Sequence, residues 1–171
     1  MQAICKVMVL ELKNMYVEGM HIRLKSGRVI LTRSVLVHID PDFKMKILLM
    51  NLSGQANEHG CDKCHFCGTP IQYSQTRGHA MKFPCTCKEK LANPRTHNDY
   101  LLHASLAKTL REESKAKLKE RGRTEQQLRE NASLNSINVM GVKDETVFSL
   151  LPYVDLAKLC GTQPMHCIFE K

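Results

Sequence analysis

Tryptophan is absent from the 171 residues of the sequence, and aromatic residues make up only 5% of it. Since 43% of the residues are nevertheless hydrophobic, the core has to be built mainly from leucine, isoleucine, valine and methionine. No stretch reaches the roughly 18 apolar residues of a membrane span, because Thr32, Arg33 and Ser34 interrupt the apolar run at residues 29–39. The N-terminus also lacks the pattern of a secretory signal, so we expect a chain that is neither inserted in a membrane nor secreted.

Eight cysteines are present in this chain, which carries no secretory signal. That context argues against a disulfide framework and for thiols, and clustered thiols indicate metal binding. Most of the cysteines lie in residues 60–97, a segment that is also rich in glycine, proline and polar residues. Cys5, Cys160 and Cys167 lie among apolar residues instead, so we interpret them as packing residues.

Two cysteine pairs in this segment have a spacing near that of a zinc ribbon. Cys61 and Cys64 follow Gly60 with two residues between them, and Cys85 and Cys87 form a second pair after an intervening loop. Zinc takes four tetrahedral ligands, and two separated pairs can close a loop around one ion. The sequence therefore predicts a structural Zn²⁺ site, with reduced, unliganded cysteines as the alternative interpretation. The alternate ligands are Cys67, His97 and His166, and the spare candidates are His65, His79 and His103.

Hydrophobic periodicity predicts a helix over residues 1–18 that stops at Gly19. Frequent β-branched residues predict a strand over residues 29–39. A short helix is expected to follow and to stop near Gly54.

The second half of the chain is predicted to be mainly helical. Residues 98–130 have the pattern of one long charged helix, in which Leu102, Leu106 and Leu110 form a narrow apolar stripe. Residues 131–143 are predicted to be a linker, and a short apolar segment follows.

Positive charge is the other marked property of the chain, whose formal net charge is +8. A basic balance of this size favours phosphate backbones or acidic surfaces as partners. The alternative is a solvated basic surface that binds nothing. The candidate nucleic-acid-binding residues are Lys115, Lys117, Lys119, Arg121 and Arg123.

Several motifs occur in an order that resembles the CACTA (En/Spm) type of cut-and-paste DNA transposase. Residues 11–19 resemble the family's run at the end of a helix, and Asp42 precedes the Gly60–Cys61 knuckle at the family's spacing. The other matching motifs lie at residues 78–84, 95–97, 141–155 and 163–166. Each motif is short, but together they span nearly the whole chain, which we interpret as an internal fragment of such a transposase.

The resemblance implies an α+β fold with a truncated RNase H-like core of helix, strand and helix. The core would occupy residues 1–55, a Cys-rich zinc-binding insertion residues 56–97, and a helical insertion and tail residues 98–171. In such a core, carboxylates hold two Mg²⁺ ions for in-line attack on a phosphodiester. Asp42 would supply one catalytic carboxylate, with Asp40 as its competitor.

The departures from the family pattern predict that this chain is not an enzyme. The first-strand aspartate of the family has no counterpart, and Gln163 replaces the family's aspartate before Met-His. Asp42 alone cannot assemble a two-metal site, so Mg²⁺ would belong only to the ancestral active enzyme. The alternative interpretation of Asp42 is a turn or helix-cap residue.

We therefore expect a catalytically inactive, transposase-derived remnant that retains DNA binding and is nuclear or cytoplasmic. One alternative is a zinc-stabilised protein-interaction module that forms homo-oligomers through residues 98–130. Another is a decayed fragment with no stable fold and no function.

Overall fold

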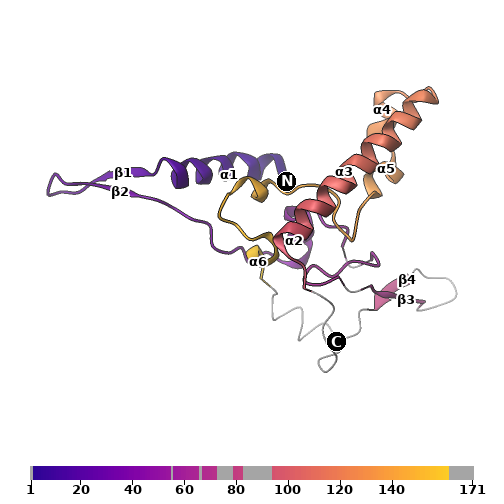
Figure 1. The fold of residues 1–171 in the computed structure, drawn as a ribbon, viewed down its shortest axis with the longest axis horizontal. Coiled ribbons are helices and arrows are strands. Elements are labelled where there is room, and N and C mark those ends of the chain that lie inside the picture. Colours follow the sequence, from indigo (N-terminus) through magenta and orange to yellow (C-terminus); the bar gives the residue numbers. More distant parts are fainter. Residues whose placement is uncertain (1, 55, 66, 73–78, 83–93, 162–171) are drawn as a thin grey trace. The chain divides into compact units, whose positions relative to one another are not determined.

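The computed structural model describes the chain except residues 1, 55, 66, 73–78, 83–93 and 162–171. The chain divides into two compact units (Figure 1). Unit 1 consists of Met1–Leu49 and Thr146–Lys171, and unit 2 of Met50–Glu145. Helices and short strands both occur, as expected for the α+β class. The insertion expected at residues 56–97 lies in unit 2. The helical part expected at residues 98–171 is divided, with residues 98–145 in unit 2 and the rest in unit 1.

Unit 1 begins with the predicted helix, α1 (Gln2–Val17). Gly19 ends it with a φ of +78°, a conformation that glycine adopts readily. A Cβ at this position would lie 2.9 Å from the carbonyl oxygen of Thr32, so the chain also needs glycine here for space. The remaining elements of unit 1 are β1 (Met20–Arg23), β2 (Val29–Thr32), α2 (Phe43–Leu49), the 3-10 helix η1 (Val147–Leu150) and α6 (Leu156–Leu159).

The single strand predicted over residues 29–39 is wrong beyond Thr32. Residues 20–32 form an antiparallel hairpin in which Met20 pairs with Thr32 and Arg23 with Val29. Arg33 and Ser34 interrupt the apolar pattern, and the chain leaves the ladder there, although Ile39 forms an isolated parallel bridge with Cys160. The hairpin projects beyond the end of α1 (Figure 1), and its residues are exposed or half-buried.

The core of unit 1 forms between α1 and the segment that contains η1 and α6. Val9 and Phe148 are almost completely buried. The Gln2 side chain donates to the carbonyl oxygens of Leu48 and Leu49 and accepts from the amide of Val147. Two of the three predicted packing cysteines, Cys5 and Cys160, are buried as expected, and Cys167 lies outside the described residues.

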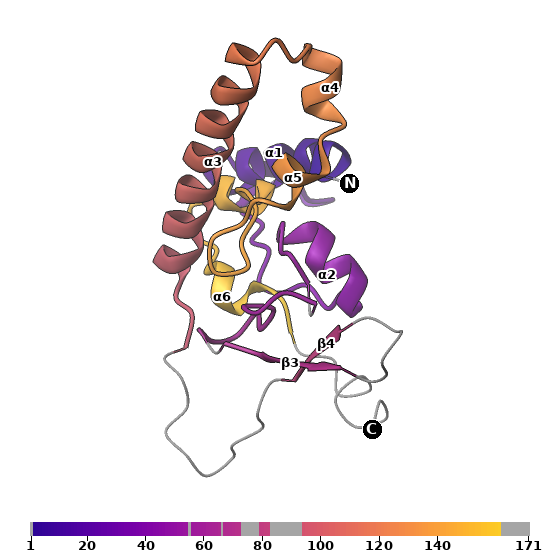
Figure 2. The same cartoon turned by 90° about the vertical axis from the view of Figure 1, so that its right-hand side faces the viewer.

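Unit 2 is built around a long helix, α3. The single helix predicted over residues 98–130 is wrong, because the structure divides this range into two helices, α3 and α4. Helix α3 ends at Glu120, because Gly122 turns the chain with a φ of +78°, and Thr124 caps the next helix through a capping box. Helices α4 and α5 then run back beside α3, so part of the predicted linker is helical (Figure 2). The elements of unit 2 are β3 (Thr69–Gln72), β4 (His79–Lys82), α3 (His97–Glu120), α4 (Glu125–Arg129) and α5 (Ala132–Ser136).

The buried face of α3 differs from its leucine stripe. Leu102, Leu106 and Leu110 are 45 to 56% exposed. Tyr100, Ala104 and Ala107 are the buried residues of the helix. Small residues at Ala104 and Ala107 let the chain pack closely against this face, while the larger leucines are left at the surface.

Candidate metal centre

The predicted Cys61–Cys64 pair forms a compact knuckle. The two sulfurs are 3.2 Å apart and no disulfide joins them. Two sulfurs on one tetrahedral zinc ion lie about 3.8 Å apart, so the pair has to open by only about 0.6 Å to bind one ion. Cys64 also forms an isolated bridge with Pro94, which brings the residues before α3 beside the knuckle.

Arg95 fixes the backbone of the knuckle. Its side chain is almost completely buried, with 4% of the residue exposed. Nε donates to the carbonyl oxygens of Cys61 (2.9 Å) and Cys64 (3.2 Å), and Nη2 donates to those of His59 (3.1 Å) and Met140 (2.5 Å). The planar guanidinium thus holds carbonyl groups from two separate chain segments in one geometry. The sequence singled out Arg95 only as part of a short motif.

The N-terminus of α3 is tied to the same loop. Tyr100 donates from its hydroxyl to the carbonyl oxygen of Asp62 at 2.6 Å, and His65 lies 3.1 Å from the Asp99 carboxylate. Asp99 also completes a capping box with Thr96. The backbone N–H of Thr96 is the main cause that lowers the pKa of Asp99 to about 2, so this carboxylate is ionised at neutral pH.

The histidines near the knuckle differ in their surroundings. His65 packs edge-on against His103 and contacts Asp99, so it already has protein partners. Burial is the main cause that lowers the pKa of His103, which favours the neutral imidazole that metals bind. His97 is half-buried as the first residue of α3.

Part of the predicted zinc site lies outside the described residues. Cys85, Cys87 and His166 belong to that part, as does the side chain of the spare candidate His79. The four-cysteine ligand set therefore stays a prediction.

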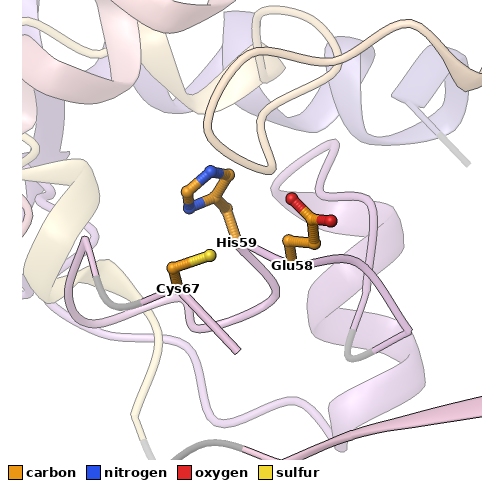
Figure 3. A group of neighbouring side chains, drawn as sticks. All are labelled: Glu58, His59 and Cys67. Atoms are coloured by element: carbon orange, nitrogen blue, oxygen red, sulfur yellow. The ribbon is translucent and has the colours of Figure 1, made fainter. Parts of the chain in front are cut away.

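The same loop holds a group of ligand side chains that the sequence did not single out as a set (Figure 3). Glu58, His59 and Cys67 each offer a ligand atom, and these atoms all lie within 4.8 Å of one another. The backbone N–H of Gly68 donates to the carbonyl oxygen of Glu58 at 2.6 Å, which brings Cys67 back to Glu58 and His59. The sequence indicated Cys67 as an alternate ligand. It did not indicate Glu58 and His59, which lie directly before Gly60 and the Cys61–Cys64 knuckle.

Asp42 acts as a helix cap. Its Oδ1 accepts a hydrogen bond from the backbone N–H of Met45 at 2.7 Å, and its carbonyl oxygen accepts one from Lys46. This is the helix-cap role that the sequence offered as the alternative to a catalytic one. Within the described part of the chain, neither Asp42 nor Asp40 belongs to a group of three side chains that could hold a metal.

The candidate nucleic-acid-binding residues lie at the end of α3 and in the turn after it. Lys115 forms an ion pair with Glu112 (2.7 Å), and Lys119 pairs with Glu125. Lys117, Arg121 and Arg123 are exposed, and no ion pair links them to another described residue.

No family model, curated protein or solved structure matches this chain. Among the described helices, none combines the length and the apolar character that crossing a membrane requires.

Proposed function

We propose that this chain is a transposase-derived, nucleic-acid-binding protein whose binding surface is held by a zinc-stabilised Cys-rich loop. The proposal rests on three exposed residues, Lys117, Arg121 and Arg123, which we call the basic group. They lie at the C-terminal end of α3, and the Cys61–Cys64 knuckle contacts the N-terminal end of the same helix. The order of motifs supports descent from a CACTA-type transposase with an RNase H-like core. Catalysis of transposition would need further carboxylates beside Asp42, whose own side chain caps a helix.

The basic group is suited to a phosphate backbone. Lys117 lies in the last turn of α3, and Arg121 is the C-cap residue of the same helix. Arg123 follows directly after the turn at Gly122. Since Lys115 and Lys119 pair with glutamates, these three residues carry the least compensated positive charge among the five candidates.

Zinc would act on this surface indirectly. The predicted ion would hold the Cys61–Cys64 knuckle, which Arg95 and Tyr100 connect to the first turns of α3. Removing zinc is therefore expected to loosen the start of α3, and with it the position of the basic group. The role proposed for zinc is therefore structural and not a direct contact to nucleic acid.

Salt dependence tests this proposal. Each phosphate neutralised on duplex DNA contributes a slope of about −0.9 to the plot of log K against log salt. Three contacts predict a slope of roughly −2.7, which is a loss of about 40-fold in affinity between 50 and 200 mM salt. Fluorescence anisotropy with a labelled duplex and a labelled single strand measures it.

The test variant is Lys117→Gln/Arg121→Gln/Arg123→Gln. Its matched control removes the same charge at exposed residues of unit 1, with Lys6→Gln/Arg33→Gln/Lys44→Gln. We expect the test variant to lose most of the affinity and of the salt slope, and the control to keep both. Equal losses in the two variants would mean that binding follows net charge alone, and salt-insensitive binding would contradict the proposal.

A second candidate function is self-association through α3. Leu102, Leu106 and Leu110 recur every four residues and are 45 to 56% exposed, so a second copy could pack against this stripe. Sedimentation velocity over a range of protein concentrations tests it. A monomer at all concentrations would exclude it, and a dimer lost in Leu106→Gln would support it.

A further inference from the structure

We propose that Glu58, His59 and Cys67 form a second metal site, the mixed site, with carboxylate, imidazole and thiolate ligands. It is separate from the zinc site predicted at the four cysteines, and it goes beyond the nucleic-acid-binding function. The ion it fits is Zn²⁺, with Co²⁺ as its spectroscopic substitute, because a mixed sulfur and nitrogen ligand set disfavours Mg²⁺ and Ca²⁺.

The geometry of the three side chains is close to that of a tetrahedral ion. Zinc bonds of about 2.0 to 2.3 Å place neighbouring tetrahedral ligands roughly 3.3 to 3.8 Å apart. The three ligand atoms lie within 4.8 Å of one another, and Glu58 and Cys67 are exposed, so small side-chain rotations can close the difference. Figure 3 shows the sulfur of Cys67 directed toward the His59 ring.

A ring nitrogen of His59 also points to a metal. Its Nδ1 is buried and has no hydrogen-bond partner among the described residues. Buried polar atoms are normally satisfied by protein, water or an ion. An imidazole nitrogen that protein groups leave unsatisfied, beside a thiol and a carboxylate, is well suited to accept a metal.

The loop that carries the mixed site is held by hydrogen bonds among its own residues. The Asn57 side chain accepts from the His59 amide at 2.9 Å, and the Asn57 carbonyl accepts from Gly60 at 2.9 Å. The amide of Gly68 then closes the loop onto Glu58. Because these bonds do not involve the Cys61 or Cys64 side chains, the mixed site is expected to form without a metal on that pair.

The two ligand groups also differ in how their ligand atoms are grouped. Within the described residues, Cys61 and Cys64 share no third ligand in a group that meets the 4.8 Å spacing, whereas Glu58, His59 and Cys67 meet it together. Three protein ligands leave a fourth tetrahedral position for water or another ligand, which a closed four-cysteine site lacks. The mixed site should therefore exchange its metal more readily.

The test is a metal count and a Co²⁺ titration on the full chain. The variants are Cys61→Ser/Cys64→Ser, His59→Gln/Cys67→Ser, and the combination of all four changes. We expect the wild type to bind two ions per chain, each double variant one, and the combination none. The absorption of Co²⁺ bound to Cys61→Ser/Cys64→Ser should show a thiolate charge-transfer band that Cys67→Ser removes.

The single variant Glu58→Gln guards against loss of metal through misfolding, because its side chain is exposed and its length is kept. It should weaken Co²⁺ binding at the mixed site by more than tenfold, since losing even an outer partner of a ligand costs about 10- to 100-fold. Glu113→Gln on the exposed face of α3 is the matched control and should leave the affinity unchanged.

One ion per wild-type chain, lost in both double variants, would overturn the proposal in favour of a single shared site. A metal count that His59→Gln/Cys67→Ser leaves unchanged would also overturn it. Neither result depends on nucleic-acid binding, which the anisotropy measurement tests separately.

Discussion

Replacing Arg95 is expected to be among the most damaging single changes to unit 2. The side chain is 4% exposed and donates from two nitrogens, Nε and Nη2, to four backbone carbonyl oxygens. A hydrogen bond to a charged group contributes about 1.5 to 3 kcal/mol to stability. Counting each nitrogen once, Arg95→Ala should lower the free energy of unfolding by about 3 to 6 kcal/mol. That is a large part of the roughly 5 to 15 kcal/mol that stabilises a typical domain.

Arg95→Lys separates charge from geometry. The ammonium group keeps the positive charge but cannot reproduce the planar fork. We therefore expect it to recover only part of the loss, about 1.5 to 3 kcal/mol, which is the strength of one hydrogen bond to a charged group. Full recovery would show that charge alone holds the knuckle.

Urea unfolding followed by circular dichroism measures these changes, and hydrogen exchange localises them to the knuckle and α3. Arg123→Ala is the control, because an exposed residue in a turn should change stability by less than about 0.5 kcal/mol. If Arg95→Ala were as mild as this control, the carbonyl contacts of Arg95 would not hold the loop.

Three further predictions concern other positions. Gly141→Ala should lower the free energy of unfolding by more than about 1 kcal/mol, because Gly141 has a φ of +81° and a Cβ would clash with the carbonyl oxygen of His59; thermal unfolding measures this. Asp99→Asn should destabilise α3 by about 1 kcal/mol. Because the Thr96 backbone lowers the pKa of Asp99 to about 2, the difference in unfolding free energy between wild type and variant should be complete above pH 4 and shrink as pH falls toward 2. A pH-independent difference would exclude this role of the carboxylate. Phe148→Ala should cost about 3 to 5 kcal/mol, since Phe148 is 1% exposed; chemical denaturation that shows a cost near zero would contradict its place in the core.

Local signals in the sequence predicted the first helix well. Residues 1–18 combine apolar periodicity with Gly19, and α1 ends where that glycine allows. The break in the second long helix was missed, because its charge pattern continues across Gly122 while the turn depends on a single left-handed residue. The strand at Met20–Arg23 was missed because four exposed residues show no burial pattern.

Among the candidate metal ligands, too, the sequence predicted the local pair and missed the contacts between distant residues. The spacing of Cys61 and Cys64 is local, and the structure brings their sulfurs together. The approach of Cys67 to Glu58 and His59 depends on a backbone hydrogen bond between Gly68 and Glu58, which no sequence pattern encodes. Contacts of this kind follow from how the loop folds, so sequence spacing alone could not have selected them.

The β1–β2 hairpin has a consequence for how the chain behaves in concentrated solution. Its strands pair only with each other in the described residues, so both outer edges offer unpaired backbone groups, and Ile22 and Ile30 are 43 to 44% exposed. Such edges template pairing between molecules, and positive charges are a common protection against it. Arg23 and Arg28 supply that protection here, because no acidic residue occurs between Gly19 and Ile39. Salt that screens these charges should therefore promote aggregation at the hairpin under the same conditions that release nucleic acid from α3.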